Sequence, residues 1–270
     1  MIDISGHTLH IRMSEDWNTS LYLRFERERT QPGRDLLARI KIDQPEEIVD
    51  LGCGPGNSTA ILRERWPAAK IVGVDNSLTM LEQAKKTDQK ADWRCQDISS
   101  WQSSSQVDLI FANASLHWLP DHESLLNSLM QQLKPGGVLA FQVPALYDQP
   151  ATAAIREISA LDLWRIYAPR SHPIVHPPRA YHDYLAGRAG SIDLWETIYH
   201  HQLSDHNAII DWYRSTGLRP YLEALPDETA RKEFQQQLLT RFRTLFPQQA
   251  GGEVLFPFRR LFVVAIRRHG

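Results

Sequence analysis

The sequence is short of cysteine, of long apolar runs and of excess charge. It holds 2 cysteines in 270 residues, Cys53 and Cys95, and their wide separation excludes a disulfide framework or a cysteine-rich zinc site. No apolar run approaches the length of a membrane span, and no signal-peptide pattern appears. Lys and Arg number 30 against 32 Asp and Glu, which indicates neither a nucleic acid nor a membrane as partner. We therefore expect a cytoplasmic protein.

Three glycines within five positions, Gly52, Gly54 and Gly56, follow a short apolar strand predicted over residues 48–51. Glycine has no Cβ, so such a loop can turn sharply and let its backbone approach a ligand closely. In an open α/β sheet, ligands related to nucleotides bind at the carboxyl ends of the strands. The loop is therefore the first candidate for a cofactor site.

Two classes of cofactor compete for this loop. The dinucleotide fingerprint G-x-G-x-x-G would need its third glycine at position 57, which is Asn57, whereas the third glycine here is Gly56. Asp50 comes just before the loop, and a carboxylate repels a phosphate but suits a cationic ligand. S-adenosyl-L-methionine carries an ammonium and a sulfonium and no phosphate. The loop resembles the first motif of the methyltransferases that depend on this donor, and we expect it as the cofactor.

The remainder of the first half alternates strand and helix. Apolar runs predict strands over 70–74, 92–96, 107–112 and 138–143, with helical patterns between them and a tight turn over 134–137. Two further strands are predicted over 193–201 and 261–266, the last of them central because it is apolar throughout. The sequence thus predicts an α/β fold with a doubly wound, mixed, seven-stranded sheet.

After residue 144 the alternation stops. Residues 152–167 have a helical pattern, and 172–182 form a proline-rich loop whose three histidines fit no metal signature. A helix is predicted to start at 181–185 and to end near 187, and residues 207–246 are mostly helical. We expect no metal, and we expect the last helices to cap the carboxyl edge of the sheet. Residues 13–270 are then one domain with cap elements at 13–30, 150–190 and 203–252. Residues 1–12 show no pattern that continues, and we expect them to be an extension of the domain.

Acidic residues at strand ends suggest how the donor is held. Asp75 lies 19 residues after Gly56 at the tip of the second strand, where a carboxylate can accept both ribose hydroxyls. Asp97 follows the third strand, and in methyltransferases that this chain resembles an acid here accepts from the adenine amino group while its apolar neighbour packs on the ring. The predicted cofactor-binding residues are Trp17, Asp50, Gly52, Gly54, Gly56, Asn57, Asp75, Asn76, Met80, Asp97, Ile98, Asn113 and Trp118.

Four further stretches narrow the resemblance. They are DWN at 16–18 with LYL at 21–23, NASLHWLPDH at 113–122, IIDW at 209–212 with TGLRP at 216–220, and RLFVVA at 260–265. Together they resemble the trans-aconitate 2-methyltransferase family over residues 13–268. The resemblance implies a Rossmann-like methyltransferase fold and methylation of one carboxylate of trans-aconitate. Residues 165–180 depart from the family pattern, which bears on the substrate if that segment lines the pocket.

The implied chemistry needs no general base, because a carboxylate is already ionised at neutral pH. The chain must instead orient a small polycarboxylate through cationic and hydrogen-bonding side chains, with His117 as a positioning residue. Arg219 is equally well explained as a partner in a salt bridge on a helix surface. The predicted substrate-binding residues are Tyr22, His117, Tyr181, Trp212, Arg219 and Arg260. We expect a monomer or weak homodimer.

Other functions stay open at this point. A methyltransferase with a hydroxyl or carbon acceptor would need a base, for which His117 is the candidate. A non-catalytic protein that binds the adenosyl group for regulation would use the helical insertion as a partner surface. Trp17 and Tyr22 either fold over the cofactor as a lid or seal the edge of the sheet.

Overall fold

The computed structural model describes residues 25–169, 172–214 and 216–269. Trp17, Tyr22, the expected extension at 1–12 and most of the first cap element lie outside the described residues. Within them the chain forms a seven-stranded sheet in the order β3-β2-β1-β4-β5-β7-β6. Its strands are β1 (Glu47–Leu51), β2 (Lys70–Asp75), β3 (Asp92–Cys95), β4 (Val107–Asn113), β5 (Leu133–Pro144), β6 (Ala189–Leu203) and β7 (Val254–Arg267).

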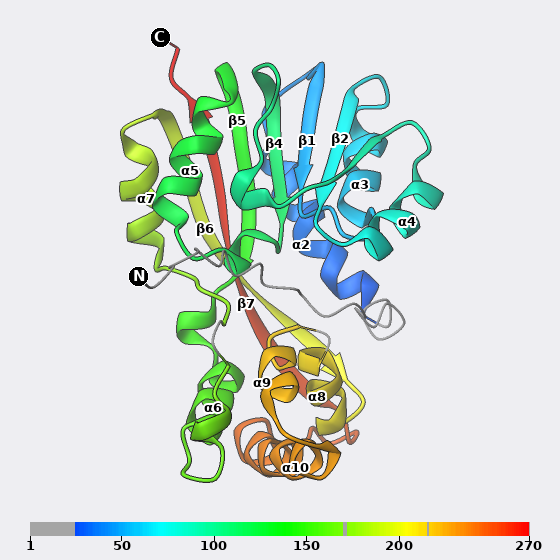
Figure 1. The fold of residues 1–270 in the computed structure, drawn as a ribbon, viewed down its shortest axis with the longest axis vertical. Helices are drawn as coiled ribbons and strands as arrows, with labels where there is room; N and C mark the ends of the chain where they lie inside the picture. The colour runs from blue at the N-terminus through cyan, green and yellow to red at the C-terminus, as the bar shows by residue number, and fades with distance from the viewer. Residues whose placement is uncertain (1–24, 170–171, 215, 270) are drawn as a thin grey trace, which may run out of the picture.

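The first five strands are parallel, and β7 runs antiparallel to both β5 and β6. This confirms the mixed, seven-stranded α/β fold, with β7 inside the sheet rather than at its edge. The helices are α2 (Glu26–Arg39), α3 (Asn57–Arg65), α4 (Leu78–Thr87), α5 (His122–Gln131), α6 (Pro150–Ser159), α7 (Pro178–Ala186), α8 (His206–Arg214), α9 (Arg219–Ala224) and α10 (Glu228–Leu245). Figure 1 shows the carboxyl ends of the parallel strands meeting at the waist of the molecule.

Apolar side chains alternate between the two faces of the sheet, because successive residues of a strand point to opposite sides. One buried cluster joins Phe111, Ala140 and Phe262 to Leu36 of α2 and Leu62 of α3. The other cluster, on the opposite face, joins Ile110, Phe141 and Val263 to residues of α5 and α7. The two faces are thus covered by different helices, as a doubly wound fold requires.

The turn predicted over 134–137 lies inside β5 as an irregular bulge. Pairing with β4 jumps from Val107↔Leu133 to Leu109↔Val138, so the extra residues of β5 loop out of the ladder. Gly136 takes φ 79°, a left-handed conformation that suits glycine. The prediction was right about the glycine turn and wrong about the start of the strand.

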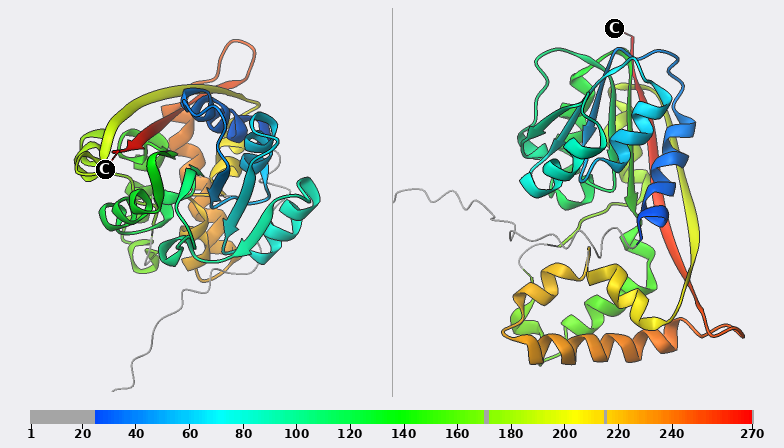
Figure 2. Two further views of the ribbon diagram at one scale, coloured as in Figure 1. Left: turned by 90° about the horizontal axis from the view of Figure 1, so that it is seen from above. Right: turned by 90° about the vertical axis from the view of Figure 1, so that its right-hand side faces the viewer.

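Strands β6 and β7 are longer than the sequence predicted, and their extra length carries a second lobe. β5 stops pairing with β7 at Pro144↔Arg260, whereas β6 and β7 stay paired as far as Leu203↔Val254. A two-stranded ribbon therefore leaves the main sheet at the waist. Figure 2 shows this ribbon running from the sheet to the lobe that contains α6 and α8 to α10.

The second lobe has its own apolar core. Ile155 of α6, Trp212 of α8 and Phe234 and Leu238 of α10 pack with Phe256 of β7, all of them buried. Helix α10 begins where the sequence places it, because the side chain of Asp227 accepts a hydrogen bond from the Ala230 N–H as an N-cap. The lobe follows the carboxyl ends of the sheet strands, which is the position expected of a cap (Figure 1).

Two predictions around α6 and α7 were wrong. The helix expected over 152–167 ends at Ser159, and a turn then brings the buried Trp164 onto Phe234 of α10, with ring centroids 5.5 Å apart. A continuous helix would carry Trp164 past this contact, so tertiary packing overrides the local helical pattern. Helix α7 begins at Pro178, inside the predicted loop and three residues before the predicted helix start, with Pro178 in its first turn, where proline is tolerated.

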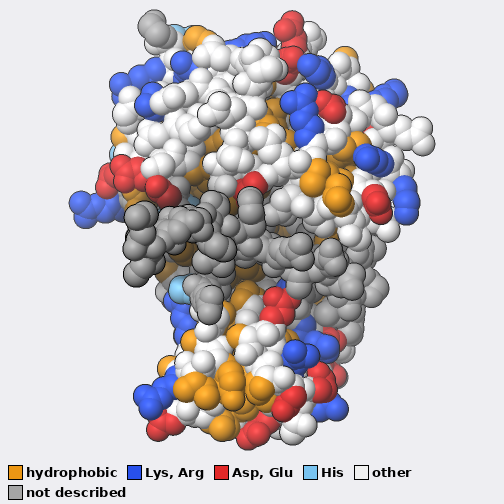
Figure 3. All heavy atoms as spheres, viewed as in Figure 1, with side chains coloured by type: hydrophobic (Ala, Val, Ile, Leu, Met, Phe, Trp, Pro, Cys, Tyr) orange, Lys and Arg blue, Asp and Glu red, His pale blue; other side chains and the backbone are white. Residues whose placement is uncertain are grey.

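Surface charge is mixed. Positive and negative side chains alternate over both lobes on the face in Figure 3, in keeping with the nearly equal totals of the two signs. None of the helices in the described parts of the chain is long and apolar enough to span a bilayer.

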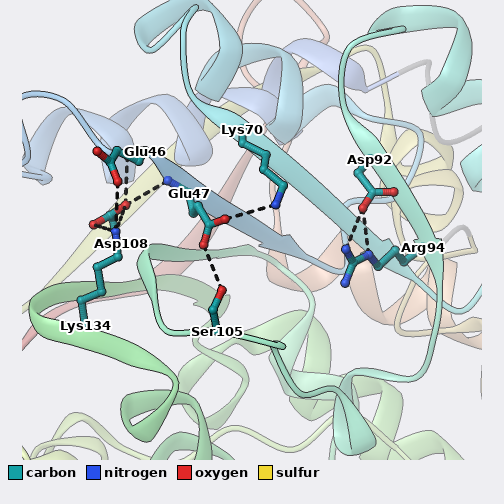
Figure 4. A network of polar contacts seen from close by, with 8 residues as sticks. All are labelled: Glu46, Glu47, Lys70, Asp92, Arg94, Ser105, Asp108 and Lys134. Atoms are coloured by element: carbon teal, nitrogen blue, oxygen red, sulfur yellow. Dashed lines mark hydrogen bonds and ion pairs between the residues drawn. The ribbon is translucent and has the colours of Figure 1, made fainter.

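Asp108 ties three elements together at the amino ends of the strands (Figure 4). Its Oδ2 accepts hydrogen bonds from the backbone N–H groups of Glu46 and Glu47, both at 2.9 Å, and from Lys134 Nζ at 3.0 Å. Partial burial alone would raise the pKa of Asp108, but the N–H of Glu47, the ammonium of Lys134 and the N–H of Glu46 together hold it below its usual value.

We expect Asp108→Asn to lower the free energy of unfolding at neutral pH by about 1–2 kcal/mol, because charged hydrogen bonds are lost. Since folding lowers this pKa, the contribution is present above about pH 4 and is lost as the pH falls through the folded-state value. Asp92→Asn is the control, because Asp92 pairs with Arg94 on the surface (Figure 4) and should change stability by less than about 0.5 kcal/mol. Urea titrations that find equal losses of unfolding free energy in the two variants would contradict the stabilising role of Asp108.

Candidate active site

The glycine loop between β1 and α3 is held against the end of β2. Gly52, Gly54 and Gly56 all have positive φ, at 71°, 54° and 94°. The backbone N–H of Gly52 donates to Val74 O at 2.7 Å, and that of Gly54 donates to Asp75 Oδ2 at 2.9 Å. The sharp turn expected from the glycine spacing is thus present and anchored.

The glycines serve different purposes within the loop. A Cβ on Gly52 would lie 2.2 Å from Cβ of Ser115, so glycine lets the β4–α5 connection pack directly on the loop. A Cβ on Gly54 would meet none of the described residues within 4 Å. Gly54 therefore presents its backbone to open space at the carboxyl end of β1, where a ligand can approach it closely.

Asp50 lies beneath the loop and is completely buried. Its Oδ2 accepts hydrogen bonds from Ser58 Oγ at 2.7 Å and Thr59 Oγ1 at 2.6 Å, which fixes the first turn of α3 to β1. Its Oδ1 is buried without a hydrogen-bond partner among the described residues. Burial raises the pKa of Asp50 to about 6, so its charge at neutral pH comes at a desolvation cost and supplies negative potential under the loop.

Asp75 stands at the end of β2, beside the loop. Its Oδ2 accepts from Gly54 and its Oδ1 accepts from the N–H of Ser77 at 2.9 Å. Burial raises the pKa of Asp75 despite these hydrogen bonds. Ser77 in turn caps α4 by accepting from the Met80 N–H at 3.3 Å. The carboxylate therefore organises the loop in addition to facing any ligand beside it.

Asp97 and Ile98 begin the next connection, η1 (Ile98–Ser100), at the same edge of the sheet. The exposed carboxylate of Asp97 accepts from the N–H and hydroxyl of Ser99, at 2.8 and 2.7 Å. Ile98 is half-buried, and its Cδ1 would lie 3.2 Å from a Cβ on Gly52. The structure thus brings Ile98 to the glycine loop, with the acid next to it.

The β4–α5 connection contains η2 (Leu116–Trp118) and places His117 and Trp118 at the waist. His117 is 6 % exposed, and its Nδ1 is buried without a hydrogen-bond partner in the described part of the chain. Burial, the positive charge of Arg260 and His122 together lower the pKa of His117 to about 3. His117 is therefore a neutral imidazole at physiological pH.

Polar side chains from three neighbouring strands form a row near the same place. Gln142 of β5 donates from Nε2 to Asn113 Oδ1 of β4 at 2.6 Å, and Arg260 of β7 donates from Nη1 to Gln142 Oε1 at 3.3 Å. The Arg260 guanidinium also lies over the ring of Phe258, 4.6 Å from its centroid. The row joins Asn113, which belongs to the predicted donor site, to Arg260, which belongs to the predicted acceptor site.

Tyr181 of α7 has a structural setting. It is completely buried against Phe141, and its hydroxyl lies 2.7 Å from Nδ1 of His122. Nε2 of the same His122 lies 3.0 Å from Leu116 O, at the start of η2. A second tie to η2 is the bond from the Ile174 N–H to His117 O at 2.8 Å. Tyr181 thus supports the segment that carries His117 instead of pointing at the Arg260 row.

Trp212 and Arg219 both belong to the second lobe. Trp212 is buried in its core with His201, their ring centroids 4.8 Å apart. Arg219 Nε lies 2.6 Å from Glu223 Oε1, one turn further along α9. Among the described substrate residues predicted from the sequence, His117 and Arg260 lie close enough for the charge of Arg260 to help lower the pKa of His117.

Three residues of this site were missed by the sequence analysis: Ser115, His122 and Gln142. Gln142 offered the clearest signal, because it is the one polar residue in the apolar run 138–143. A buried amide needs partners for both its donor and its acceptor, so a glutamine inside a core strand indicates a polar site on the neighbouring strands.

The loop fits an adenosyl donor that lacks phosphates. Gly54 offers open space, Asp50 and Asp75 place two carboxylates close to it, and no basic side chain among the residues just described for the loop would balance a pyrophosphate. A cationic sulfonium and ammonium suit this potential, whereas an anionic dinucleotide does not.

We expect Gly54→Ala to weaken the binding of S-adenosylhomocysteine by about tenfold or more, because the new methyl group would stand where the ligand approaches. Gly252→Ala is a matched control, since Gly252 also has positive φ, 93°, with none of the described residues within 4 Å of a Cβ, and lies in the loop before β7. Both variants should lose a similar 1–2 kcal/mol of stability, roughly, from the left-handed backbone. Calorimetry that finds equal affinities for the two variants would rule out this position for the donor.

Comparison with known proteins agrees with this geometry. A family described as a methyltransferase domain matches residues 22–190. The trans-aconitate 2-methyltransferase of Azoarcus sp. (strain BH72) is 44% identical over 251 residues, which cover 93% of this chain and 99% of that protein. The protein of the same name from Shigella flexneri is also 44% identical, covering 93% of this chain and 98% of its own.

A solved structure supports the fold. Phosphoethanolamine N-methyltransferase 2 of Haemonchus contortus, in complex with S-adenosylhomocysteine, is 13% identical and superimposes with a TM-score of 0.56 over 88% of this chain and 53% of that one. A match at this identity speaks only for the shared architecture, whereas the two relatives match nearly from end to end. The chain therefore belongs to the trans-aconitate 2-methyltransferase family of S-adenosylmethionine-dependent methyltransferases.

Proposed function

We propose that this protein methylates one carboxylate of trans-aconitate, or of a closely related small tricarboxylate, to give a methyl ester. The observation that carries the proposal is the buried guanidinium of Arg260, 5 % exposed, at the carboxyl end of the sheet beside a neutral His117. A buried positive charge next to a donor site is suited to an anionic acceptor. The names of the two relatives give the acceptor its identity.

The donor side is formed by the loop and the strand ends. S-adenosylmethionine, when bound, supplies a methyl group on a positively charged sulfur. We assign Gly54 to close backbone contact, Asp75 to the ribose, and Asp97 with Ile98 to the adenine. Asp50 holds α3 in place and adds negative potential beneath the loop. Gly52, Gly56, Asn57, Asn76, Met80, Asn113 and Trp118 complete the proposed set, and Trp17 lies outside the described residues.

The acceptor needs orientation more than activation. Its carboxylates are ionised at neutral pH, so no residue has to remove a proton before methyl transfer. His117 would in any case be a poor base, because burial, Arg260 and His122 lower its pKa to about 3. This argues against the alternative acceptors, a hydroxyl or a carbon, that require His117 to take a proton. We assign His117 and Arg260 to binding and orientation of the substrate.

Water exclusion by the second lobe would favour the reaction. The anionic acceptor and the cationic donor cancel each other's charge as they react, and a dry site favours that cancellation more than water does. Residues of both lobes respond to the charge of Arg260: His117 in the sheet lobe, and Tyr213 on α8 in the second lobe. The acceptor would then lie between the lobes. Trp212 and Arg219 would act by holding the second lobe together, and Tyr181 by supporting η2 through His122. Tyr22 is outside the described residues.

The assay for this function offers the purified protein isotope-labelled S-adenosylmethionine and a panel of di- and tricarboxylic acids. We expect label in a monomethyl ester of trans-aconitate, with dicarboxylates weaker because they lose a charged contact of about 1.5–3 kcal/mol. We expect the reaction in the cytoplasm and a monomer or weak homodimer. Label transferred only to hydroxyl or amine compounds in a broader panel would refute the proposal.

Two adjacent arginines on β7 provide a matched test of the acceptor site. Arg260→Ala should raise the KM for trans-aconitate by about tenfold or more, from the loss of a charged hydrogen bond. Arg259→Ala should leave the KM within about twofold, because Arg259 points to the opposite side of the strand and pairs with Asp148 and Glu196 at 2.9 and 3.5 Å. S-adenosylhomocysteine binding and the melting temperature show whether each variant is folded. A folded Arg260→Ala protein with an unchanged KM would remove Arg260 from the site.

A further inference from the structure

Gln142 is buried in the middle of the sheet, with no exposed surface. Alternation along β5 puts it on the same face as Val138 and Ala140, which is the face covered by α2. Asn113 follows Phe111 on that face of β4, and Arg260 precedes Phe262 on that face of β7. Three adjacent strands therefore present an asparagine, a glutamine and an arginine to one side of the sheet at its carboxyl end.

The direction of the hydrogen bonds in this row is determined by chemistry. A guanidinium can only donate, so the side of Gln142 that faces Arg260 must be its oxygen. The Gln142 nitrogen then faces Asn113, whose oxygen accepts at 2.6 Å. The Asn113 nitrogen is consequently turned towards α2, where a Cβ on Gly33 would lie 3.3 Å from it. One amide thus sets the orientation of both neighbours.

The choice of an amide at position 142 has an electrostatic consequence. A glutamine oxygen accepts from Arg260 without a negative charge of its own, so the pair remains cationic. A glutamate in this place could make the same hydrogen bond but would cancel the charge, because opposite charges at about 3 Å in a buried setting interact strongly. The charge of Arg260 acts on two neighbouring histidines. Burial is the larger cause and Arg260 the second cause that lower the pKa of His117 to about 3 and that of His201 to about 4.

We propose that Gln142 is a specificity-determining positioning residue: it holds the Arg260 guanidinium in place for an anionic acceptor while leaving its charge intact, and it links this group to Asn113 at the donor site. The inference rests on the proposed function, because the acceptor is taken to be a polycarboxylate. It adds a residue outside the set assigned to the substrate, one that acts through its two neighbours Arg260 and Asn113.

Two substitutions separate this role from a structural one. Gln142→Glu keeps the size of the side chain and an acceptor for Arg260, but its carboxylate cannot donate to Asn113, whose amide must turn to donate instead. Gln142→Met keeps the size and removes both hydrogen bonds. If Gln142 only stabilises the sheet, the Met variant should be the more damaged in every measurement. The proposal predicts the opposite order for acceptor binding, because only the Glu variant cancels the charge and adds a like charge near the substrate.

The measurement is calorimetric binding of trans-aconitate to the protein saturated with S-adenosylhomocysteine, which needs no turnover. Gln142→Glu should weaken the binding of trans-aconitate by about tenfold or more, and Gln142→Met should weaken it by less. The affinity of Gln142→Glu for S-adenosylhomocysteine should change by less than about threefold. Assays of turnover should show the same loss in KM, with a smaller change in kcat. NMR titration should also show the pKa of His117 higher in Gln142→Glu than in the wild type.

Gln132→Glu is the matched control. Gln132 is a half-buried amide with both ends in use: its oxygen accepts from the Ser103 N–H, and its nitrogen donates to Trp101 O at 3.2 Å. It lies at the amino ends of the strands, away from Arg260, so the same change should cost stability without changing trans-aconitate affinity. If wild-type protein binds trans-aconitate and Gln142→Glu binds it equally well, the inference is wrong and the proposed function stands. If wild-type protein neither binds nor methylates trans-aconitate, both are wrong.

Discussion

The antiparallel pairing of β5 with β7 is the interaction on which the rest of the structure depends. It runs from Val138↔Ile266 to Pro144↔Arg260 and makes β7 an internal strand of the sheet. Because β7 extends beyond the end of β5, the same strand that completes the sheet also enters the second lobe. The point where β5 ends is therefore the waist of the molecule, and Arg260 stands there. One register thus fixes both the position of the second lobe and the position of the cationic side chain.

Burial also sets the charge states of the titratable side chains at the site. Burial keeps His117 and His201 neutral, with pKa values lowered to about 3 and about 4, while Arg260 keeps its charge and accounts for part of each shift. On the donor side burial raises the pKa of Asp50 to about 6. Negative potential therefore collects under the glycine loop and positive potential at Arg260. This separation of charge suits a cationic donor on one side and an anionic acceptor on the other.

Much of the sheet lobe was predictable because its signals are local. Glycine spacing, the acid at the tip of β2 and continuous apolar strands each reflect a constraint that acts within a few residues. The second lobe was less predictable, since the end of α6 at Ser159 depends on the packing of Trp164 against a helix about 70 residues later in the chain. The role of Tyr181 was equally hard to predict. Its hydroxyl was predicted to bind the substrate, but in the structure it lies within hydrogen-bonding distance of His122.

The sequence by itself determined the fold class, the family and the sharp glycine turn after β1, because apolar periodicity and glycine geometry are properties of short segments. The tertiary structure decided which polar residues work together. Asn113, Gln142 and Arg260 are spread over almost 150 positions and meet only because β4, β5 and β7 pair side by side in one register. Register between distant strands is set by the packing of the whole sheet, and no short stretch of sequence contains it.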